Sequence, residues 1–153
     1  MVKPEWSGDW PNLNAHNARI TSPETPDYNC LAFSAGRLDQ WWEPYVIPPK
    51  EPGKYWLDGV HPDNTPEDWT AVLATVGFEP CKDSCLEPGW VKVALYAKSS
   101  SVTHAARQLR DGRWTSKLGV FEDIEHDDLS VLEGALYGTV RLFLRRPRRD
   151  EDP

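Results

Sequence analysis

The sequence predicts an α+β fold in which two helices precede an antiparallel sheet of about four strands. Three observations support this prediction. Two segments in the first half of the chain begin with helix-capping residues, at Asn29 and at Thr65. From residue 90 onward apolar and polar residues alternate, which is typical of strands. Within that half, Asp111-Gly112 is a strong signal for a tight hairpin turn.

The composition is that of one globular domain. The chain has 153 residues, of which 39% are hydrophobic and 27% charged, and this length can bury a genuine core. The 8 Trp and 14 Pro residues favour a loop-rich fold braced by large flat side chains. The net charge of −7 argues against nucleic acid and anionic membranes as partners, and we expect a monomer or a weak oligomer.

The sequence indicates a cytoplasmic protein with no membrane partner. Its first residues contain no apolar run of the kind that forms a secretory signal. No stretch approaches the roughly 20 apolar residues that span a bilayer. The 3 cysteines are an odd number, which favours reduced thiols in a cytosol. A thiol that forms no disulfide bond is available as a reactive group.

The first predicted elements surround a cysteine. Residues 1–27 are polar and contain several prolines, so we expect an irregular lead-in. Asn29 as N-cap and Gly36 as a stop predict a short helix, and they place Cys30 in its first turn. Residues 37–64, with several Trp and Pro, are predicted to form an ordered loop.

The second predicted helix has the clearest signals. Thr65 is a suitable N-cap, Pro66 suits the first helical position, and Asp68 is placed to complete a capping box. Gly77 closes the helix. Apolar residues follow the capping box at the spacing of one buried face, namely Trp69, Val72, Leu73 and Val76.

The remaining chain is predicted to form the sheet. The predicted strands are residues 91–97, 102–110, 113–118 and 136–144. The acidic stretch 122–128 is predicted to be a loop or a short helical approach. We expect residues 1–147 to form a single domain and residues 148–153 to form a charged, flexible tail. The arginines of residues 145–149 are followed at once by acidic residues, which favours a solvated tail over a nucleic-acid patch.

Cys30 is the candidate nucleophile. A thiol reacts as thiolate, and the unpaired amides and dipole of a helix N-terminus stabilise that anion. The same amides can donate to an oxyanion during acyl transfer. The alternative is that Cys30 is a small buried hydrophobic residue, which is the commoner role of a lone intracellular cysteine.

His104 is the candidate partner of Cys30, because it lies early in a predicted strand and is followed by the small residues Ala105 and Ala106. Its alternative role is that of a half-buried strand histidine bonded to a backbone carbonyl. The other three histidines are weaker candidates. His126 lies in an acidic run that would hold it protonated in an ion pair, and His16 and His61 lie in loops rich in Pro and Asn.

Cys81 and Cys85 form a C-x3-C pair around Asp83. A zinc site usually needs a second pair of ligands, and none is evident nearby. We therefore expect structural or incidental thiols at these positions, and neither a metal nor a cofactor in the protein.

Six blocks of the sequence carry a family resemblance, namely Tyr28 to Gly36, Trp41-Trp42, Tyr55-Trp56, Lys92 to Tyr96, Thr103 to Leu109 and Gly112 to Gly119. They resemble a family of uncharacterised bacterial proteins over about residues 21–147. The pairing of Cys30 with His104 resembles the papain-like superfamily, particularly its NlpC/P60-like branch. This resemblance implies a single papain-like domain, with the helix of the nucleophile packed on the antiparallel sheet.

The resemblance also implies a third residue that orients the imidazole, and Ser116 lies about where the superfamily places it. The length of the hairpin loop determines whether Ser116 lies on the same face of the sheet as His104. A two-residue turn would pair Ala106 with Lys117 and bring Lys117 to the face of His104, where it would repel an imidazolium. A three-residue loop or a bulge would bring Ser116 there instead. A backbone carbonyl is the alternative orienting group.

The substrate-binding candidates are aromatic. No oxyanion-hole glutamine precedes Cys30, and Tyr28 is a candidate donor in its place. The loop that contains Trp42 and Trp56 is a candidate recognition surface, although these residues could equally cap the core. The aromatic residues of this loop are Trp41, Trp42, Tyr45, Tyr55 and Trp56.

Three functions remain open from the sequence. The first is a thiol hydrolase that cleaves an amide or peptide bond in a peptide or in another protein through Cys30 and His104. The second is a binding module on the same scaffold that has lost catalysis. The third is a toxin or effector deamidase, which shares the chemistry of the first and differs in substrate.

Overall fold

The structure is a computed structural model that describes residues 2–44 and 53–153 of the chain. It contains two α-helices, α1 (Cys30–Ser34) and α2 (Pro66–Ala74), and two 3-10 helices, Pro4–Ser7 and Leu129–Leu132. The strands in the described residues are β1 (Ala18–Ser22), β2 (Trp41–Trp42), β3 (Lys54–Tyr55), β4 (Glu79–Cys81), β5 (Trp90–Lys98), β6 (Ser101–Gln108), β7 (Trp114–Lys117), β8 (Asp123–His126) and β9 (Thr139–Pro147).

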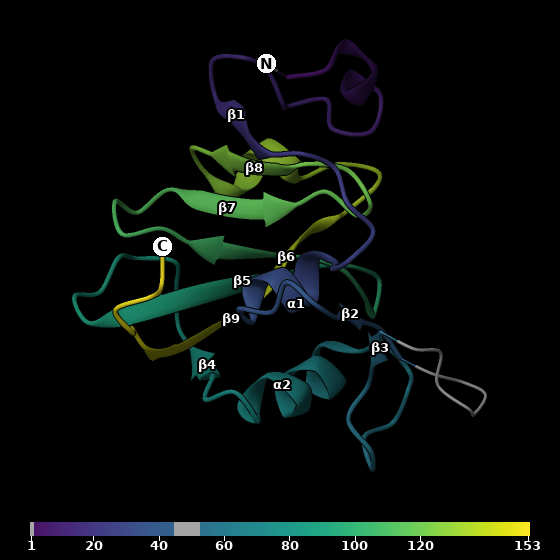
Figure 1. Cartoon of the computed structure of the whole chain (residues 1–153), viewed down its shortest axis with the longest axis vertical. Coiled ribbons are helices and arrows are strands. Elements are labelled where there is room, and N and C mark those ends of the chain that lie inside the picture. The colour runs from purple at the N-terminus through teal and green to yellow at the C-terminus, as the bar shows by residue number, and fades with distance from the viewer. Residues whose placement is uncertain (1, 45–52) are drawn as a thin grey trace.

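A seven-stranded sheet forms the centre of the molecule, in the order β1-β8-β7-β6-β5-β9-β4 (Figure 1). Every neighbouring pair in it is antiparallel. Strands β2 and β3 form a separate parallel pair. Helix α1 packs on β6 and β7, whereas α2 packs on β4, β6 and β9. Among the described residues, no helix has both the length and the apolar character needed to cross a membrane.

The predicted fold class was wrong. The protein is mostly β, with seven strands in its main sheet in place of about four and with two short helices. The sheet is therefore not the small sheet of a papain-like domain. The difference arises at the edges, since β1, β4 and β8 come from segments in which no strand was predicted.

The missed strands lack the usual apolar alternation. In β8, Asp123 and His126 are buried although both are polar, so this acidic stretch forms a strand instead of the predicted loop or helical approach. In β1, every second residue is only half-buried, and Arg19 pairs with Glu125 of β8. These strands are held by cross-strand polar contacts, which hydrophobic periodicity does not detect.

Both predicted helices are confirmed. Asn29 caps α1, its side-chain oxygen accepting from the amide of Ala32, and Gly36 follows the helix with a φ of +92°. Thr65 and Asp68 form the complete capping box of α2. The predicted apolar face of α2 is buried at Trp69, Val72 and Leu73.

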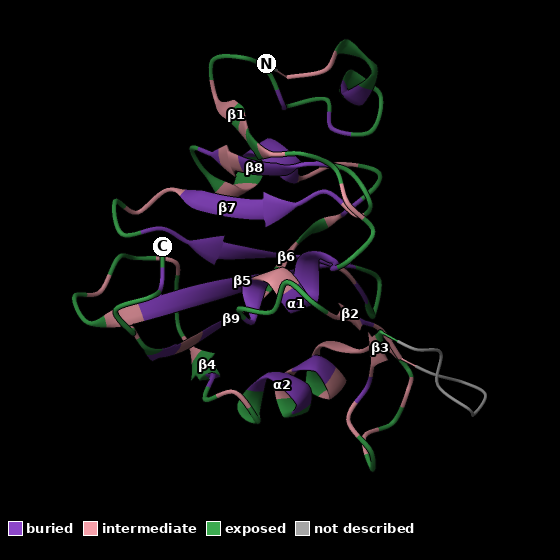
Figure 2. Ribbon diagram, in the orientation of Figure 1, coloured by how far each residue is buried: buried purple, intermediate pink, exposed green. Residues whose placement is uncertain are grey.

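Buried residues form two hydrophobic cores, one on each face of the sheet. Figure 2 shows that the central strands of the sheet are buried along most of their length. The first core joins both helices to the sheet through residues such as Leu31, Val72 and Leu95. The second core joins the N-terminal segment to the opposite face through residues such as Trp10 and Tyr96. Lys92 of β5 is also buried, where its ammonium pairs with two carboxylates.

The β6–β7 hairpin has a three-residue loop. Arg107 pairs with Thr115, and the amide of Leu109 donates to the carbonyl of Arg113 at 2.7 Å, which leaves residues 110–112 as the loop. Gly112 accommodates a φ of +92° there. Of the two predicted alternatives, this is the one that brings Ser116 to the face of His104.

The end of the chain is attached to the sheet. Within residues 148–153, for which a flexible tail was predicted, Asp152 is buried. Its carboxylate pairs with Arg107 and Arg146, and the amide of Arg149 donates to it at 2.8 Å. Asp150 and Glu151 are exposed.

Candidate functional site

Cys30 is the first residue of α1 and borders a cavity of about 420 Å³. Its side chain is mostly buried, with 8% exposed. Asn29 fixes the start of this helix against β2, because its amide nitrogen donates to the carbonyl of Trp42 at 2.6 Å and its oxygen accepts from the amide of Trp42 at 3.1 Å. The cavity is also bordered by Asn29, Trp41, Trp42, Thr103, Gly119 and Tyr137.

The thiol of Cys30 is protonated at neutral pH. Burial raises its pKa to about 11, and three influences oppose this rise. These influences are hydrogen bonding from the amide of Ala105, hydrogen bonding from the amides of Leu31 and Cys30 at the helix start, and the charge of Lys117. The helix start thus favours the thiolate as expected, but desolvation has the larger effect.

His104 is fully buried on β6 between two tyrosines. Its ring stacks on Tyr137 with centroids 4.2 Å apart and contacts Tyr96 edge-on at 5.2 Å. Burial, together with the charge of His126, holds its pKa well below the ordinary value of 6.5. The imidazole is therefore neutral at physiological pH.

A chain of hydrogen bonds determines which nitrogen of His104 carries the proton. Nδ1 of His126 lies 2.9 Å from the carbonyl oxygen of Asp128, so it is the protonated nitrogen of that ring. Nε2 of His126 must then accept from the hydroxyl of Ser116, 2.8 Å away. The Ser116 oxygen in turn accepts from Nε2 of His104 at 2.9 Å. This leaves Nδ1 of His104 unprotonated, and it is buried without a hydrogen-bond partner among the residues that the structure describes.

The structure brings His104 and Ser116 together, but it does not join His104 to Cys30 by a hydrogen bond. The only nitrogen of His104 that is bonded is Nε2, and its partner is Ser116. The side chain of Cys30 belongs to the core on the helix face, whereas His104 contacts Tyr137 of the opposite core. Tyr137, on which His104 stacks, also borders the cavity of Cys30.

Tyr28 is not free to act as an oxyanion donor. Its hydroxyl donates to Oδ2 of Asp123 at 2.7 Å, and this bond uses its only proton. Burial and this carboxylate raise the pKa of Tyr28 to about 12. The ring of Tyr28 stacks on Phe33 of α1, so this residue supports the helix of Cys30.

The two predicted substrate-binding tryptophans have different positions. Trp42 borders the cavity of Cys30, and its indole nitrogen donates to Gln40 at 3.0 Å. Trp56 is buried in the core, where it packs edge-on against Trp69 and its indole nitrogen donates to the carbonyl of Val60 at 3.1 Å. Trp42 is thus placed to contact a ligand, whereas Trp56 caps the core.

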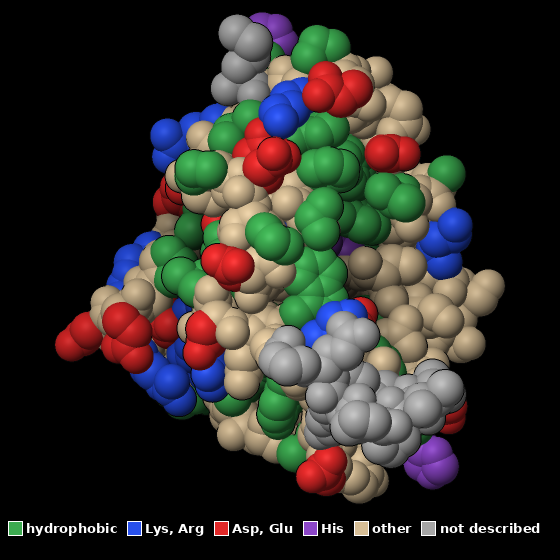
Figure 3. Space-filling view, turned by 45° about the vertical axis from the view of Figure 1, so that its right-hand side comes forward, with side chains coloured by type: hydrophobic (Ala, Val, Ile, Leu, Met, Phe, Trp, Pro, Cys, Tyr) green, Lys and Arg blue, Asp and Glu red, His purple; other side chains and the backbone are tan. Residues whose placement is uncertain are grey.

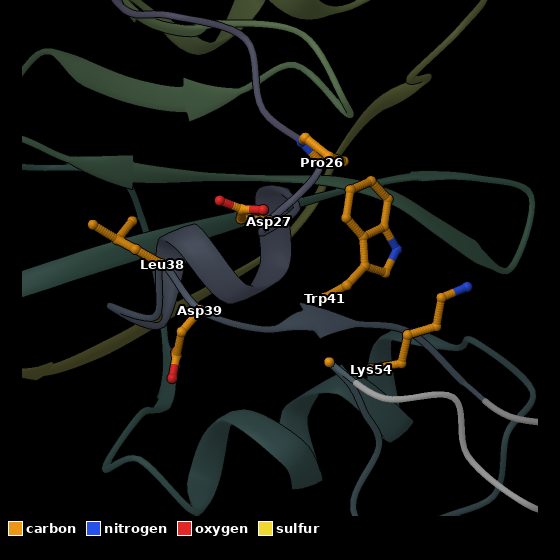
Figure 4. A pocket seen from close by; sticks show the side chains of 7 residues that line it. Pro26, Asp27, Leu38, Asp39, Trp41 and Lys54 are labelled. Carbon is orange, nitrogen blue, oxygen red and sulfur yellow. The ribbon is translucent and has the colours of Figure 1, made fainter.

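A second cavity of about 680 Å³ adjoins the first at Trp41, which borders both. Asp27 lies across this cavity from Trp41, and the ammonium of Lys54 points away from Asp27 (Figure 4). Of the other predicted recognition residues, Tyr55 packs on Trp42 with ring centroids 4.9 Å apart. Tyr45 lies outside the described residues.

His126 is the site residue that was misjudged from the sequence. Its acidic neighbours were expected to keep it protonated, but it is buried and its pKa is lowered to about 4. Desolvation therefore outweighs the charges of Asp127 and Asp128. The signal that identifies His126 is its register, since it pairs with Trp114 across β7 and β8.

The remaining cysteines lie apart from the cavity of Cys30. All three cysteines are free. Cys81 is partly buried and Cys85 is exposed. Lys92, beside Cys81, favours the thiolate of that residue, although burial raises its pKa overall. Among the described residues, no group of three or more His, Cys, Asp or Glu side chains is arranged to hold a metal ion.

Comparison with known proteins identifies one family. Residues 19–145 match the family described as a domain of unknown function, DUF7689. This match includes Cys30, His104, Ser116 and His126. Neither the curated proteins nor the solved structures contain a match to the chain.

Proposed function

We propose that this chain, which belongs to the DUF7689 family, is a thiol hydrolase that cleaves an amide or peptide bond through Cys30 and His104. The observation that most supports this proposal is the hydrogen-bond chain through Ser116. It holds the proton of His104 on Nε2 and leaves Nδ1 as a buried base with no partner. An unsatisfied buried nitrogen of this kind costs about 1–3 kcal/mol, so its presence calls for a functional explanation.

The position of Cys30 supports the same proposal. Its thiol lies where the unpaired amides of a helix start can stabilise both a thiolate and a nearby oxyanion. It borders a cavity that joins a second cavity at Trp41. An extended substrate such as a peptide can occupy both cavities, with its scissile bond at Cys30.

The reaction uses the thiol as nucleophile and Nδ1 of His104 as base. The sulfur attacks the carbonyl carbon while the thiol proton moves to Nδ1, and negative charge forms on the carbonyl oxygen near the amides of Cys30 and Leu31. The C–N bond then breaks, and the imidazolium returns the proton to the departing amine. Water, deprotonated by the same nitrogen, hydrolyses the thioester and restores the thiol.

The two groups are neutral in the free protein. Burial raises the pKa of Cys30 and lowers that of His104, so a stable thiolate–imidazolium pair does not form. Proton transfer therefore accompanies attack on the substrate. The sulfur and the ring lie in different cores, so the proposed proton transfer requires Tyr137, which stacks on His104 and borders the cavity of Cys30, to move when substrate binds.

An acylation experiment tests the proposal. The folded protein is treated with an aryl ester probe that carries an affinity handle, and mass spectrometry locates the acyl group. We expect a thioester at Cys30, none in the variant Cys30→Ala, and acylation reduced about 100-fold or more in His104→Gln. Modification of exposed Cys85 with none at Cys30 until the protein unfolds would contradict the proposal.

A binding module that has lost catalysis is the second candidate. It is favoured by the high pKa of Cys30 and by the absence of a hydrogen bond between Cys30 and His104. Figure 3 shows hydrophobic side chains in a band down one face of the molecule. The large apolar side chains that are exposed among the described residues are Leu38, Leu86, Val120, Phe121 and Leu136. A toxin or effector deamidase would give the same acylation result as the hydrolase and would differ in its substrate.

The three free thiols also fit a reducing compartment, and we extend the proposal to a cytoplasmic location.

A further inference from the structure

We propose that the ammonium of Lys117 is a fixed positive charge of the site and stabilises the negative sulfur of Cys30 during the reaction. This inference rests on the proposed thiol chemistry. The negative sulfur of Cys30 is then stabilised by a lysine on β7, beneath the helix of Cys30, and not by His104.

Lys117 is fully buried, yet its ammonium is held by backbone groups alone. Nζ donates to the carbonyl of Thr25 at 2.8 Å, and to those of Gly119 and Phe121 at 2.5 Å each. These three bonds use all of its protons and fix its position. Gly119 also borders the cavity of Cys30, so the charge lies directly behind a wall of the site.

The charge of Lys117 is only partly compensated. Among the described residues, no carboxylate lies within 4.0 Å of its ammonium, which is unusual because buried charges are normally paired. Asp123 is its cross-strand neighbour on β8, but Oδ2 of Asp123 accepts from Tyr28. Glu122 is paired with Lys3. A buried cation of this kind favours a further negative charge nearby.

Cys30 is placed to carry that charge. Lys117 lies over the ring of Tyr28, 5.2 Å from its centroid, and Tyr28 precedes Cys30 by two residues. The ammonium of Lys117 lowers the pKa of Cys30, and the thiolate raises that of Lys117, although burial dominates both groups. The other charges that act on Lys117 come from Asp123, Glu122 and Glu24.

The positive field of Lys117 favours the thiolate at Cys30, whereas the pKa of His104 is lowered by burial and by the charge of His126. Burial nevertheless keeps the thiol of Cys30 and the imidazole of His104 neutral in the free protein. Negative charge then forms only as the sulfur attacks the substrate. The same field stabilises the oxyanion that forms next to Cys30.

The test measures the alkylation rate of each cysteine by iodoacetamide between pH 6 and 10, read by mass spectrometry in one sample. In Lys117→Met we expect the apparent pKa of Cys30 to rise by about one unit, so that its alkylation slows about tenfold below that pKa. The rate of Cys81 should stay unchanged.

Lys92→Met is the matched control, since Lys92 is also a buried lysine but lies beside Cys81. It should slow Cys81 and leave Cys30 unchanged. A second variant, Asp123→Asn, keeps Lys117 and removes the carboxylate that acts most strongly on it, so it should accelerate the alkylation of Cys30. This variant provides a test if Lys117→Met does not fold.

An unchanged alkylation rate of Cys30 between pH 6 and 10 in folded Lys117→Met, or slower alkylation in Asp123→Asn, would overturn the role of Lys117. A different result would contradict the thiol hydrolase proposal, namely the absence of probe acylation at Cys30 in the unaltered protein.

Discussion

Nε2 of His104 lies 2.9 Å from Oγ of Ser116, and this contact joins β6 to β7 beyond the last residue pair of their ladder. The same hydroxyl lies 2.8 Å from Nε2 of His126. One serine therefore connects two buried imidazoles, and it transmits to His104 the tautomer that the carbonyl of Asp128 fixes at His126.

Ser116→Ala should destabilise the protein by about 1–3 kcal/mol, because it leaves a buried donor on His104 and a buried acceptor on His126 without a partner. Urea unfolding measures this loss. Ser34→Ala is the control, since Ser34 is buried but its hydroxyl has no partner, so its removal should cost less than about 1 kcal/mol. Equal effects of the two substitutions would show that the hydroxyl of Ser116 does not have this role.

Stability should fall as the pH drops from about 6.5 to about 4. The folded protein holds the pKa of His126 at about 4, whereas an unfolded histidine takes up its proton near its ordinary value of 6.5. The unfolded state thus binds more protons in this window, and His126 contributes up to about 1.4 kcal/mol per pH unit. His104 acts in the same direction.

Urea unfolding at several pH values measures this slope. His126→Gln should flatten it, and the same substitution at exposed His16 should leave it unchanged. A slope that is the same in both variants would mean that the imidazole of His126 is protonated in the folded state.

Asp152→Ala should cost about 3–5 kcal/mol, because it leaves Arg107 and Arg146 as buried charges without their shared partner. Chemical unfolding measures the change. Glu151→Ala removes a neighbouring but exposed charge and should change stability by less than about 0.5 kcal/mol. A small effect at Asp152 would indicate that residues 148–153 leave the sheet in solution.

Asn29→Ala should affect both stability and the thiol. The substitution removes the cap of α1 and the contact of its side chain with Trp42, at a cost of about 1–2 kcal/mol. The start of α1 then loses its fixed position, so alkylation of Cys30 should become faster as its burial decreases. Asn29→Asp keeps the oxygen that caps α1 but places a carboxylate oxygen against the carbonyl of Trp42, so it should restore the cap and not the contact with β2. If the alkylation rate of Cys30 is unchanged in Asn29→Ala, the cap of α1 does not control the burial of the thiol.

Local signals in the sequence predicted the parts of the fold that local chemistry controls. Both helices begin at their capping residues because these side chains satisfy amides only a few residues away. Strand β5 was predicted because apolar residues recur at every second position from Val91 to Ala97, although the residues between them are buried as well. Strands β1 and β8 were missed because polar pairs such as Arg19 with Glu125 hold them together, and those pairs depend on residues far apart in the chain.

In the site, too, features set by residues nearby in the sequence were predicted, whereas features set by the tertiary fold were not. Cys30 and His104 were identified from their positions in a helix and a strand. Ser116 was named from the superfamily resemblance, and the three-residue loop brings it to His104. His126 was assigned the wrong charge, because its acidic neighbours in sequence have less effect than the burial that the tertiary fold imposes. The contacts of Lys117 with three carbonyls depend on loop conformations that residue patterns do not reveal.

Helix α1 precedes in the chain the strands on which it packs, β6 and β7. With five residues it is too short to persist alone in water. During folding, Cys30 therefore remains solvated until the later hairpin has formed and docked. The nascent chain carries an ordinary thiol, and the desolvated thiol of the site exists only in the folded domain. Protection of Cys30 from alkylation thus marks the completion of folding.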